Sequence, residues 1–196
     1  MDTCETVLVD LRTTAVLVVD MINEYLACDG KIICKSGHEI IEPINSITNF
    51  CRANSGLILF CNTEINSGNE PIARKWGVHA KANTKSSKVF EKLATHQNDI
   101  AIPKISYNAF FKSNLEETLK EQKISTVIVC GIHTHICVLL TAAAAFDIGY
   151  NVIVMEDCMT TDYKPNNDTR LRFLSTHIGS LTTSSEFIRI NQCHCD

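Results

Sequence analysis

The feature that most constrains the fold of this chain is a series of short, uninterrupted apolar segments that are rich in β-branched residues. Strands buried on both faces, as in a parallel sheet, have this pattern, whereas strands with one face in water alternate apolar and polar residues. We expect such buried strands at 15–19, 57–61, 100–102, 126–130 and 152–155, with a weaker sixth at 187–190.

Segments with helical spacing separate these apolar runs. Their apolar positions are Ile40, Ile44, Ile47 and Cys51, then Leu115 and Leu119, then Ala142, Ala145 and Phe146, and finally Leu171, Leu174 and Ile178. Strands that alternate with helices form right-handed crossovers on a parallel sheet. The sequence therefore predicts an α/β fold, a three-layer doubly wound sandwich around a mostly parallel central sheet of about six strands. Residues 60–89 fit neither pattern, and we interpret them as an excursion that covers a pocket.

Length and charge indicate a single domain over residues 1–196 and narrow its partners. A chain of this size can bury enough surface to fold without a metal or disulfide. A net charge of −4 does not provide the positive charge that binding to a nucleic-acid backbone requires. The longest apolar run, 138–146, is too short to span a bilayer, and the N-terminus lacks the pattern of a secretory signal. We expect a cytoplasmic protein with no nucleic-acid or membrane partner.

The ten cysteines do not form the patterns of a disulfide scaffold or a zinc ribbon. No Cys-x-x-Cys pair occurs, and residues such as Cys61 and Cys130 lie inside apolar runs, so we expect free buried thiols. The tail Cys193-His194-Cys195 could bind a metal in isolation. We interpret it as a terminal segment with incidental thiols.

Three reactive side chains follow apolar runs at the expected carboxyl edge of the sheet, where open α/β folds bind ligands. They are Asp20, Lys104 and Cys137. Taken singly, each has an ordinary interpretation, as a turn residue, a solvated charge and a small buried side chain. Their coincidence at one edge favours a functional site.

Together the three residues suggest nucleophilic catalysis by a thiol. If Thr134 or a neighbour caps the next helix, Cys137 falls in the first turn, where the helix dipole favours an anion. Lys104 would add a full positive charge, and both effects would lower the thiol pKa. Asp20 could accept the thiol proton and deliver it to a departing amine.

Three segments carry these residues in motifs that resemble the isochorismatase-like cysteine hydrolases, a superfamily that includes nicotinamidases and N-carbamoylsarcosine amidases. The segments are 17–25 (LVVDMINEY), 103–110 (PKISYNAF) and 131–138 (GIHTHICV). The resemblance extends over nearly the whole chain and implies an isochorismatase-like fold. Because relatives form dimers and tetramers, it also implies a homo-oligomer.

The resemblance assigns roles to the matching residues. It implies a catalytic triad of Asp20, Lys104 and Cys137. It also implies a cis peptide between Ile132 and His133, which aims the backbone N–H groups of His133 and Cys137 at an oxyanion. The substrate pocket that it implies contains Tyr25, Trp76, Tyr107, Phe110 and His135.

One departure from the resemblance concerns metal. Metal-dependent nicotinamidases carry an Asp-x-His pair and a further His in a Trp-x-x-His element. Residues 76–79 (WGVH) keep the second, whereas residues 64–66 read EIN. Glu64, Asn66 and His79 could hold a cation weakly, but one imidazole that zinc prefers is lost. We predict no metal and no other cofactor.

His133, His135 and Cys137 could alternatively form a metal cluster. In a helix, however, residues two apart point about 200° apart, so only His133 and Cys137 would share a face. We favour the nucleophile interpretation over the cluster.

The sequence thus predicts a cysteine-dependent hydrolase that cleaves an amide or ureido C–N bond in a small neutral or anionic molecule. The reaction passes through a thioester and releases ammonia. Two alternatives stay open, an isochorismatase-type vinyl-ether hydrolase and a non-catalytic binding or scaffold protein that retains the fold. The sequence does not identify the substrate.

Overall fold

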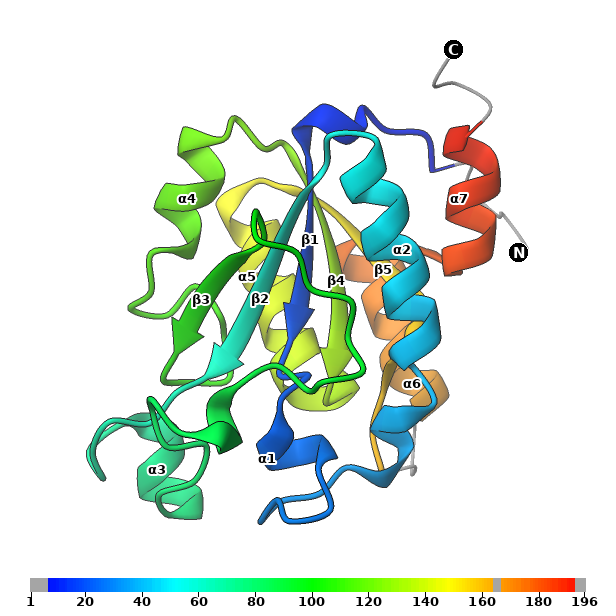
Figure 1. Cartoon of the computed structure of the whole chain (residues 1–196). Coiled ribbons are helices and arrows are strands. Elements are labelled where there is room, and N and C mark those ends of the chain that lie inside the picture. Colours follow the sequence, from blue (N-terminus) through cyan, green and yellow to red (C-terminus); the bar gives the residue numbers. More distant parts are fainter. Residues whose placement is uncertain (1–6, 164–166, 193–196) are drawn as a thin grey trace.

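The computed structural model describes residues 7–163 and 167–192 (Figure 1). Its central sheet has six parallel strands in the order β3-β2-β1-β4-β5-β6. The strands are β1 (Thr14–Val19), β2 (Leu57–Thr63), β3 (Ile100–Lys104), β4 (Thr126–Ile132), β5 (Asn151–Thr160) and β6 (Ser180–Thr182). The winding direction reverses between β1 and β4, which creates the crevice where such sheets bind ligands. The predicted fold class is confirmed.

Within the described residues, seven α-helices lie on the two faces and at the carboxyl edge of this sheet. They are α1 (Asn23–Leu26), α2 (Ile41–Ala53), α3 (Pro71–Trp76), α4 (Leu115–Glu121), α5 (Leu139–Ile148), α6 (Asn167–Phe173) and α7 (Ser184–Gln192). Figure 1 shows α2 and α7 on the near face of the sheet and α5 on the far face. Within the described ranges, none of these helices has the length and apolar character needed to cross a bilayer.

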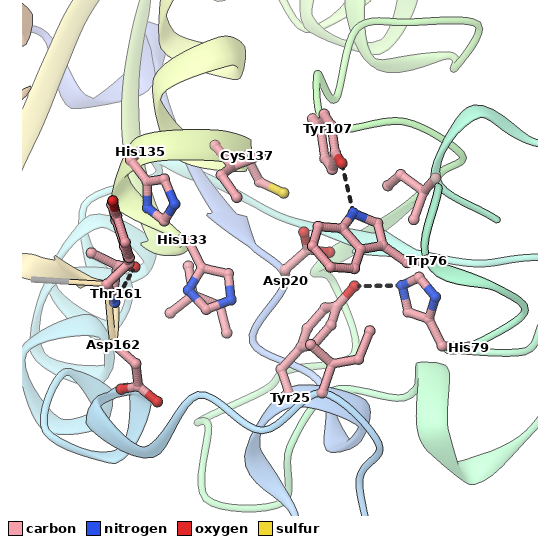
Figure 2. A pocket seen from close by; sticks show the side chains of 15 residues that line it. Asp20, Tyr25, Trp76, His79, Tyr107, His133, His135, Cys137, Thr161 and Asp162 are labelled. Atoms are coloured by element: carbon pink, nitrogen blue, oxygen red, sulfur yellow. Dashed lines mark hydrogen bonds between the residues drawn. The ribbon is translucent and has the colours of Figure 1, made fainter. Parts of the chain in front are cut away.

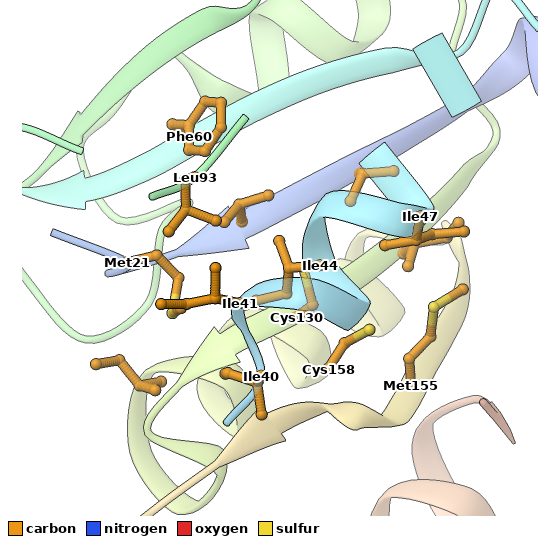
Figure 3. Packing of buried hydrophobic residues seen from close by; sticks show 14 of the residues in the cluster. Met21, Ile40, Ile41, Ile44, Ile47, Phe60, Leu93, Cys130, Met155 and Cys158 are labelled. Atoms are coloured by element: carbon orange, nitrogen blue, oxygen red, sulfur yellow. The ribbon is translucent and has the colours of Figure 1, made fainter. Parts of the chain in front are cut away.

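The two hydrophobic cores come from alternate residues of the same strands, as a doubly wound sheet requires. In β1, Val16 and Val18 pack in one core with Ile44 of α2, whereas Leu17 packs in the other with Leu119 of α4. Figure 3 shows isoleucines of α2 pointing into the first core. This division explains why the strand segments are apolar on both faces.

The seven cysteines within the described residues are all free. Six of them are buried, and Figure 3 shows Cys130 and Cys158 within the first core. Burial raises the pKa of Cys51 and Cys61 to about 12. The thiols of Cys51 and Cys61 therefore act as small apolar side chains.

The prediction of a sixth strand at residues 187–190 is wrong. Residues 187–190 lie in α7, where Phe187 is buried and its ring lies 6.5 Å from that of Phe50 in an edge-on contact. The sixth strand is β6, whose three residues are too few to give a sequence signal. The helical face expected after β4 also needs correction, because Ala142 and Ala145 are buried while Phe146 is half exposed.

Gly131 lets β4 approach β1 at the point where the two strands end. Its φ is +112°, and a Cβ at this position would lie 2.1 Å from the carbonyl oxygen of Val19. We expect Gly131→Ala to lower the free energy of unfolding by about 2 kcal/mol or more, because both the backbone conformation and the space exclude a side chain. Urea denaturation would measure this loss. Gly68→Ala is the matched control, since a Cβ there meets nothing within 4 Å.

Candidate active site

Four polar side chains meet at the carboxyl ends of adjacent strands. Thr63 ends β2 and Lys104 ends β3, and the two residues are partners in the sheet register. Asp20 directly follows β1 with a left-handed φ of +57°, a conformation that Asp tolerates better than most residues. Cys137 lies on the helical turn after β4. The parallel order of the strands therefore brings these residues to one edge.

The Lys104 ammonium group is fully buried and has one ion-pair partner and three hydrogen-bond acceptors. Its Nζ lies 2.7 Å from Oδ2 of Asp20 and donates to Oγ1 of Thr63 at 3.0 Å, to the carbonyl oxygen of Ser106 at 3.1 Å and to Sγ of Cys137 at 3.7 Å. A lysine has three N–H donors, so its hydrogen bonds use all of them. Burial lowers the pKa of Lys104, but Asp20 and Cys137 raise it by more, so the net pKa lies above the ordinary value. The side chain therefore stays positively charged.

The Asp20 carboxylate is held in one orientation by Thr63. Its Oδ1 accepts hydrogen bonds from the backbone N–H of Thr63 at 2.8 Å and from the Thr63 hydroxyl at 2.9 Å. Because this hydroxyl donates its one proton to Asp20, it can only accept from Lys104. Thr63 thus links the carboxylate and the ammonium group and fixes both.

Removing the Thr63 hydroxyl should impair turnover more than binding. We expect Thr63→Val to lower kcat for the reaction proposed below about 10- to 100-fold, since a hydrogen bond to a charged group is worth about 1.5–3 kcal/mol. KM should change by less than about threefold, because Thr63 lies behind Asp20 and outside the cavity lining. Thr63→Ser keeps the hydroxyl and should retain activity. Steady-state kinetics of both variants would check this, and equal losses in the two would contradict a role for the hydroxyl.

The Cys137 thiol is buried, with Sγ 3.7 Å from Nζ of Lys104. Burial raises the thiol pKa, Lys104 opposes this effect, and the Asp20 carboxylate adds to it, so the net pKa is well above the ordinary value. Our expectation of a lowered pKa was therefore wrong. The main reason is that burial of the thiol disfavours its anionic form, and the nearby Asp20 carboxylate adds to this effect, so that the charge of Lys104 is outweighed. Cys137 rests as a neutral thiol and needs a base to become a nucleophile.

The turn that carries Cys137 also differs from expectation. Residues Thr134–Val138 form a π-helical turn that continues into α5, and its N-cap position belongs to His133 without a side-chain cap. The hydroxyl of Thr134 is buried without a hydrogen-bond partner among the described residues. The peptide bond between Ile132 and His133 is cis. A backbone hydrogen bond from His133 to the thiol of Cys137 favours the anionic sulfur.

The thiol faces a cavity of about 240 Å³. Figure 2 shows Asp20 and Cys137 beside this space, with Trp76 and Tyr25 on one side and His133 on the other. Its lining residues are Asp20, Tyr25, Ile32, Ile72, Trp76, His79, Tyr107, Ile132, His133, His135, Ile136, Cys137, Thr161, Asp162 and Tyr163. A reactive sulfur therefore shares one small cavity with a carboxylate and several aromatic rings.

Comparison with known proteins identifies the family. The isochorismatase domain family matches residues 14–186, which include all four strand-end residues described above. The chain belongs to this family.

One relative and two solved structures illustrate what the chain is similar to. The isochorismatase family protein YwoC of Bacillus subtilis is 26% identical over 185 residues, which cover 92% of this chain and 95% of that protein. A cysteine hydrolase from Pseudomonas syringae pv. phaseolicola superposes with a TM-score of 0.88 at 23% identity, over 94% of this chain and 95% of that one. N-carbamoylsarcosine amidase from Thermoplasma acidophilum gives a TM-score of 0.79 at 25% identity, over 88% and 96%. The chain is an isochorismatase-family hydrolase.

Of the side chains expected in the pocket of this family member, the structure places four in the cavity wall. They are Tyr25, Trp76, Tyr107 and His135. Phe110 requires a correction, because it lies outside the lining and stacks on Tyr150 with ring centroids 6.3 Å apart.

Local hydrogen bonds hold the backbone around Phe110. The backbone N–H of Ala109 donates to Oγ1 of Thr141 on α5, and that of Phe110 donates to Oδ1 of Asn108. The first of these bonds ties the chain after Tyr107 to α5. The half-buried Phe110 ring packs against the core between the sheet and the far-face helices.

His79 is tied into the wall rather than presented to the cavity as a free ligand. Its Nδ1 lies 2.9 Å from the carbonyl oxygen of Gly77, which can only accept, so Nδ1 carries the proton. The Nε2 atom then accepts a hydrogen bond from the Tyr25 hydroxyl at 3.1 Å. Glu64 is half-buried and Asn66 is exposed. Within residues 7–163 and 167–192, no group of three or more His, Cys, Asp or Glu side chains is arranged to hold a metal. The Cys193-His194-Cys195 tail lies outside the described residues.

Sequence reasoning missed the part of the wall that follows β5. Thr161, Asp162 and Tyr163 line the cavity directly after this strand. The apolar run ends at Met155, whereas β5 continues to Thr160. Polar residues that follow a strand end are the signal that identified Asp20. The same signal would have found Asp162 if the end of β5 had been placed correctly.

Proposed function

We propose that this protein is a cysteine-dependent amidohydrolase that cleaves the C–N bond of a small amide or ureido compound and releases ammonia. The observation that carries this proposal is the contact of one buried ammonium group with both the Asp20 carboxylate and the Cys137 thiol beside a small cavity. A sulfur nucleophile, an adjacent base and a group that orients both are the parts that nucleophilic catalysis requires. The amidase activity named for one relative agrees with this chemistry.

In the first step, Asp20 takes the proton from the Cys137 thiol as Sγ bonds to the substrate carbonyl carbon. The raised thiol pKa makes this transfer necessary at neutral pH. The C=O electron pair moves to oxygen and forms an oxyanion. Backbone N–H groups of His133 and Cys137 on the cis-linked turn are the proposed donors to that oxyanion. Lys104 keeps Asp20 in place throughout.

In the second step, the oxyanion collapses and the C–N bond breaks. Asp20 returns its proton to the departing nitrogen, so the nitrogen of the amide leaves as ammonia. The acyl group remains bound to Cys137 as a thioester. Water then attacks the thioester carbon while Asp20 accepts a proton from it. The C–S bond breaks, the thiol regains its proton, and the product is a carboxylic acid from an amide or a carbamic acid from a ureido compound.

The experiment that tests this function combines ammonia release with trapping of the thioester. Wild-type protein would be incubated with a panel of small amides and ureido compounds, and ammonia would be measured. Rapid acid quenching and mass spectrometry of the digested protein should find the acyl group on the peptide that contains Cys137.

Other outcomes would favour the two alternatives. Hydrolysis of a vinyl ether without an adduct at Cys137 would favour an isochorismatase-type hydrolase. Absence of turnover and of any adduct across the panel would favour a binding or scaffold protein.

A further inference from the structure

The side of the cavity that Trp76, Tyr107, Tyr25 and Ile72 form presents rings and a branched apolar side chain rather than free polar groups. Trp76 donates its indole N–H to the hydroxyl of Tyr107 at 2.7 Å, and the Tyr25 hydroxyl donates a hydrogen bond to Nε2 of His79. The polar edges of these aromatic residues are thus used within the wall. Ile72 lines the cavity beside them. What remains for a ligand on this side is apolar surface.

No described residue that lines the cavity is a lysine or an arginine. Lys104 lies behind the site, and its three N–H donors already have protein acceptors. Arg170 lies over the ring of Tyr163, 5.2 Å from its centroid, and is not part of the lining. A carboxylate on a ligand would therefore find no free cationic side chain in the described wall.

The two half-buried histidines of the wall do not supply this missing charge. Desolvation is the main cause that lowers the pKa of His133 and that of His135 below the ordinary value. Both imidazoles are accordingly uncharged for the most part at neutral pH. They offer hydrogen bonds to a ligand but no positive charge.

Among the described residues of the wall, Asp162 is a carboxylate without a cationic side-chain partner. It lies across the cavity from Trp76 (Figure 2). Its exposed carboxylate accepts backbone hydrogen bonds from Lys35 at 2.7 Å and from Ser36 at 2.9 Å. Slight desolvation raises its pKa, but these hydrogen bonds outweigh that effect and hold the pKa below the usual value. At neutral pH the cavity is therefore apolar on one side and negative on the other.

The geometry points to a substrate whose non-reacting part is apolar, small enough for this cavity, and free of negative charge. This inference rests on the proposed amidohydrolase function and narrows it, because the sequence left anionic substrates open. The volume of 240 Å³ equals about eight water molecules, which suits a single ring or a short branched chain beside the amide. A carboxylate would lose its hydration without gaining a cation and would also face Asp162.

Trp76 allows this inference to be tested without turnover, because it is the only tryptophan of the chain and lines the cavity. Ligand affinities would be measured from its fluorescence in Cys137→Ala protein, with benzamide, 4-carboxybenzamide and 4-(aminomethyl)benzamide as neutral, anionic and cationic probes. We expect the anionic probe to bind at least about tenfold more weakly than the other two, mainly because its carboxylate is desolvated without a partner.

A second variant isolates the contribution of Asp162. In the same background, Asp162→Asn should reduce the affinity ratio between the neutral and the anionic probe about two- to fivefold. The expected change is modest because the carboxylate is exposed and its field is screened by water. Tightest binding of the anionic probe, or no fluorescence response to any probe, would overturn the inference. Ammonia release by wild-type protein is scored separately. If it fails while the binding order holds, only the proposed reaction is wrong.

Discussion

Cys137→Ala is expected to lower kcat for ammonia release by about 10,000-fold or more, because the proposed reaction has no route to a thioester without this sulfur. The fold should persist, since Lys104 keeps its three oxygen acceptors when the thiol is removed. Steady-state kinetics with any amide that the wild-type protein hydrolyses would measure the loss, and thermal unfolding would show that the variant is folded.

The control for Cys137→Ala is the same change at Cys28. Cys28 is exposed and lies outside the cavity lining. Cys28→Ala should keep full activity and should also keep the acyl adduct on the peptide that contains Cys137. If Cys137→Ala retained activity within about tenfold of wild type, sulfur would not be the nucleophile, and direct attack by water would replace the thioester route.

The meeting of Asp20, Lys104 and Cys137 could be predicted from sequence because it depends only on where strands end. Each residue ends or follows an apolar strand segment, and parallel strands place their carboxyl ends at one edge. Local sequence marks such ends well when the run stops abruptly, as it does after Val19. It marked the end of β5 poorly, because Glu156 and Asp157 interrupt the apolar pattern while the strand continues.

The sign of the pKa shift at Cys137 could not be predicted, because it depends on how deeply the thiol is buried and on how close the charges lie to it. Lys104 alone would have favoured the thiolate. Burial of the thiol and the neighbouring Asp20 carboxylate outweigh this effect. The position of Phe110 was also predicted wrongly, because sequence spacing does not show that its ring lies against Tyr150.

Lys104→Met is expected to lower the free energy of unfolding by about 3–5 kcal/mol, the usual cost of removing one partner from a buried ion pair. Methionine nearly matches the lysine stem in shape but leaves the carboxylate of Asp20 buried at 1% exposure without its counter-charge. It also leaves Oγ1 of Thr63 and the carbonyl oxygen of Ser106 without their donor. Urea denaturation at pH 7 would measure the loss, and turnover should fall with it because Asp20 is no longer held.

The double variant Asp20→Asn/Lys104→Met separates charge from packing. Removing both charges takes away the uncompensated carboxylate, so the double variant should be more stable than Lys104→Met alone, although it should be inactive. If the double variant lost as much stability relative to wild type as the two single variants lose together, the two side chains would not interact. The ion pair would then have no part in the stability of the site, and the proposal that Lys104 holds Asp20 for proton transfer would lose its physical basis.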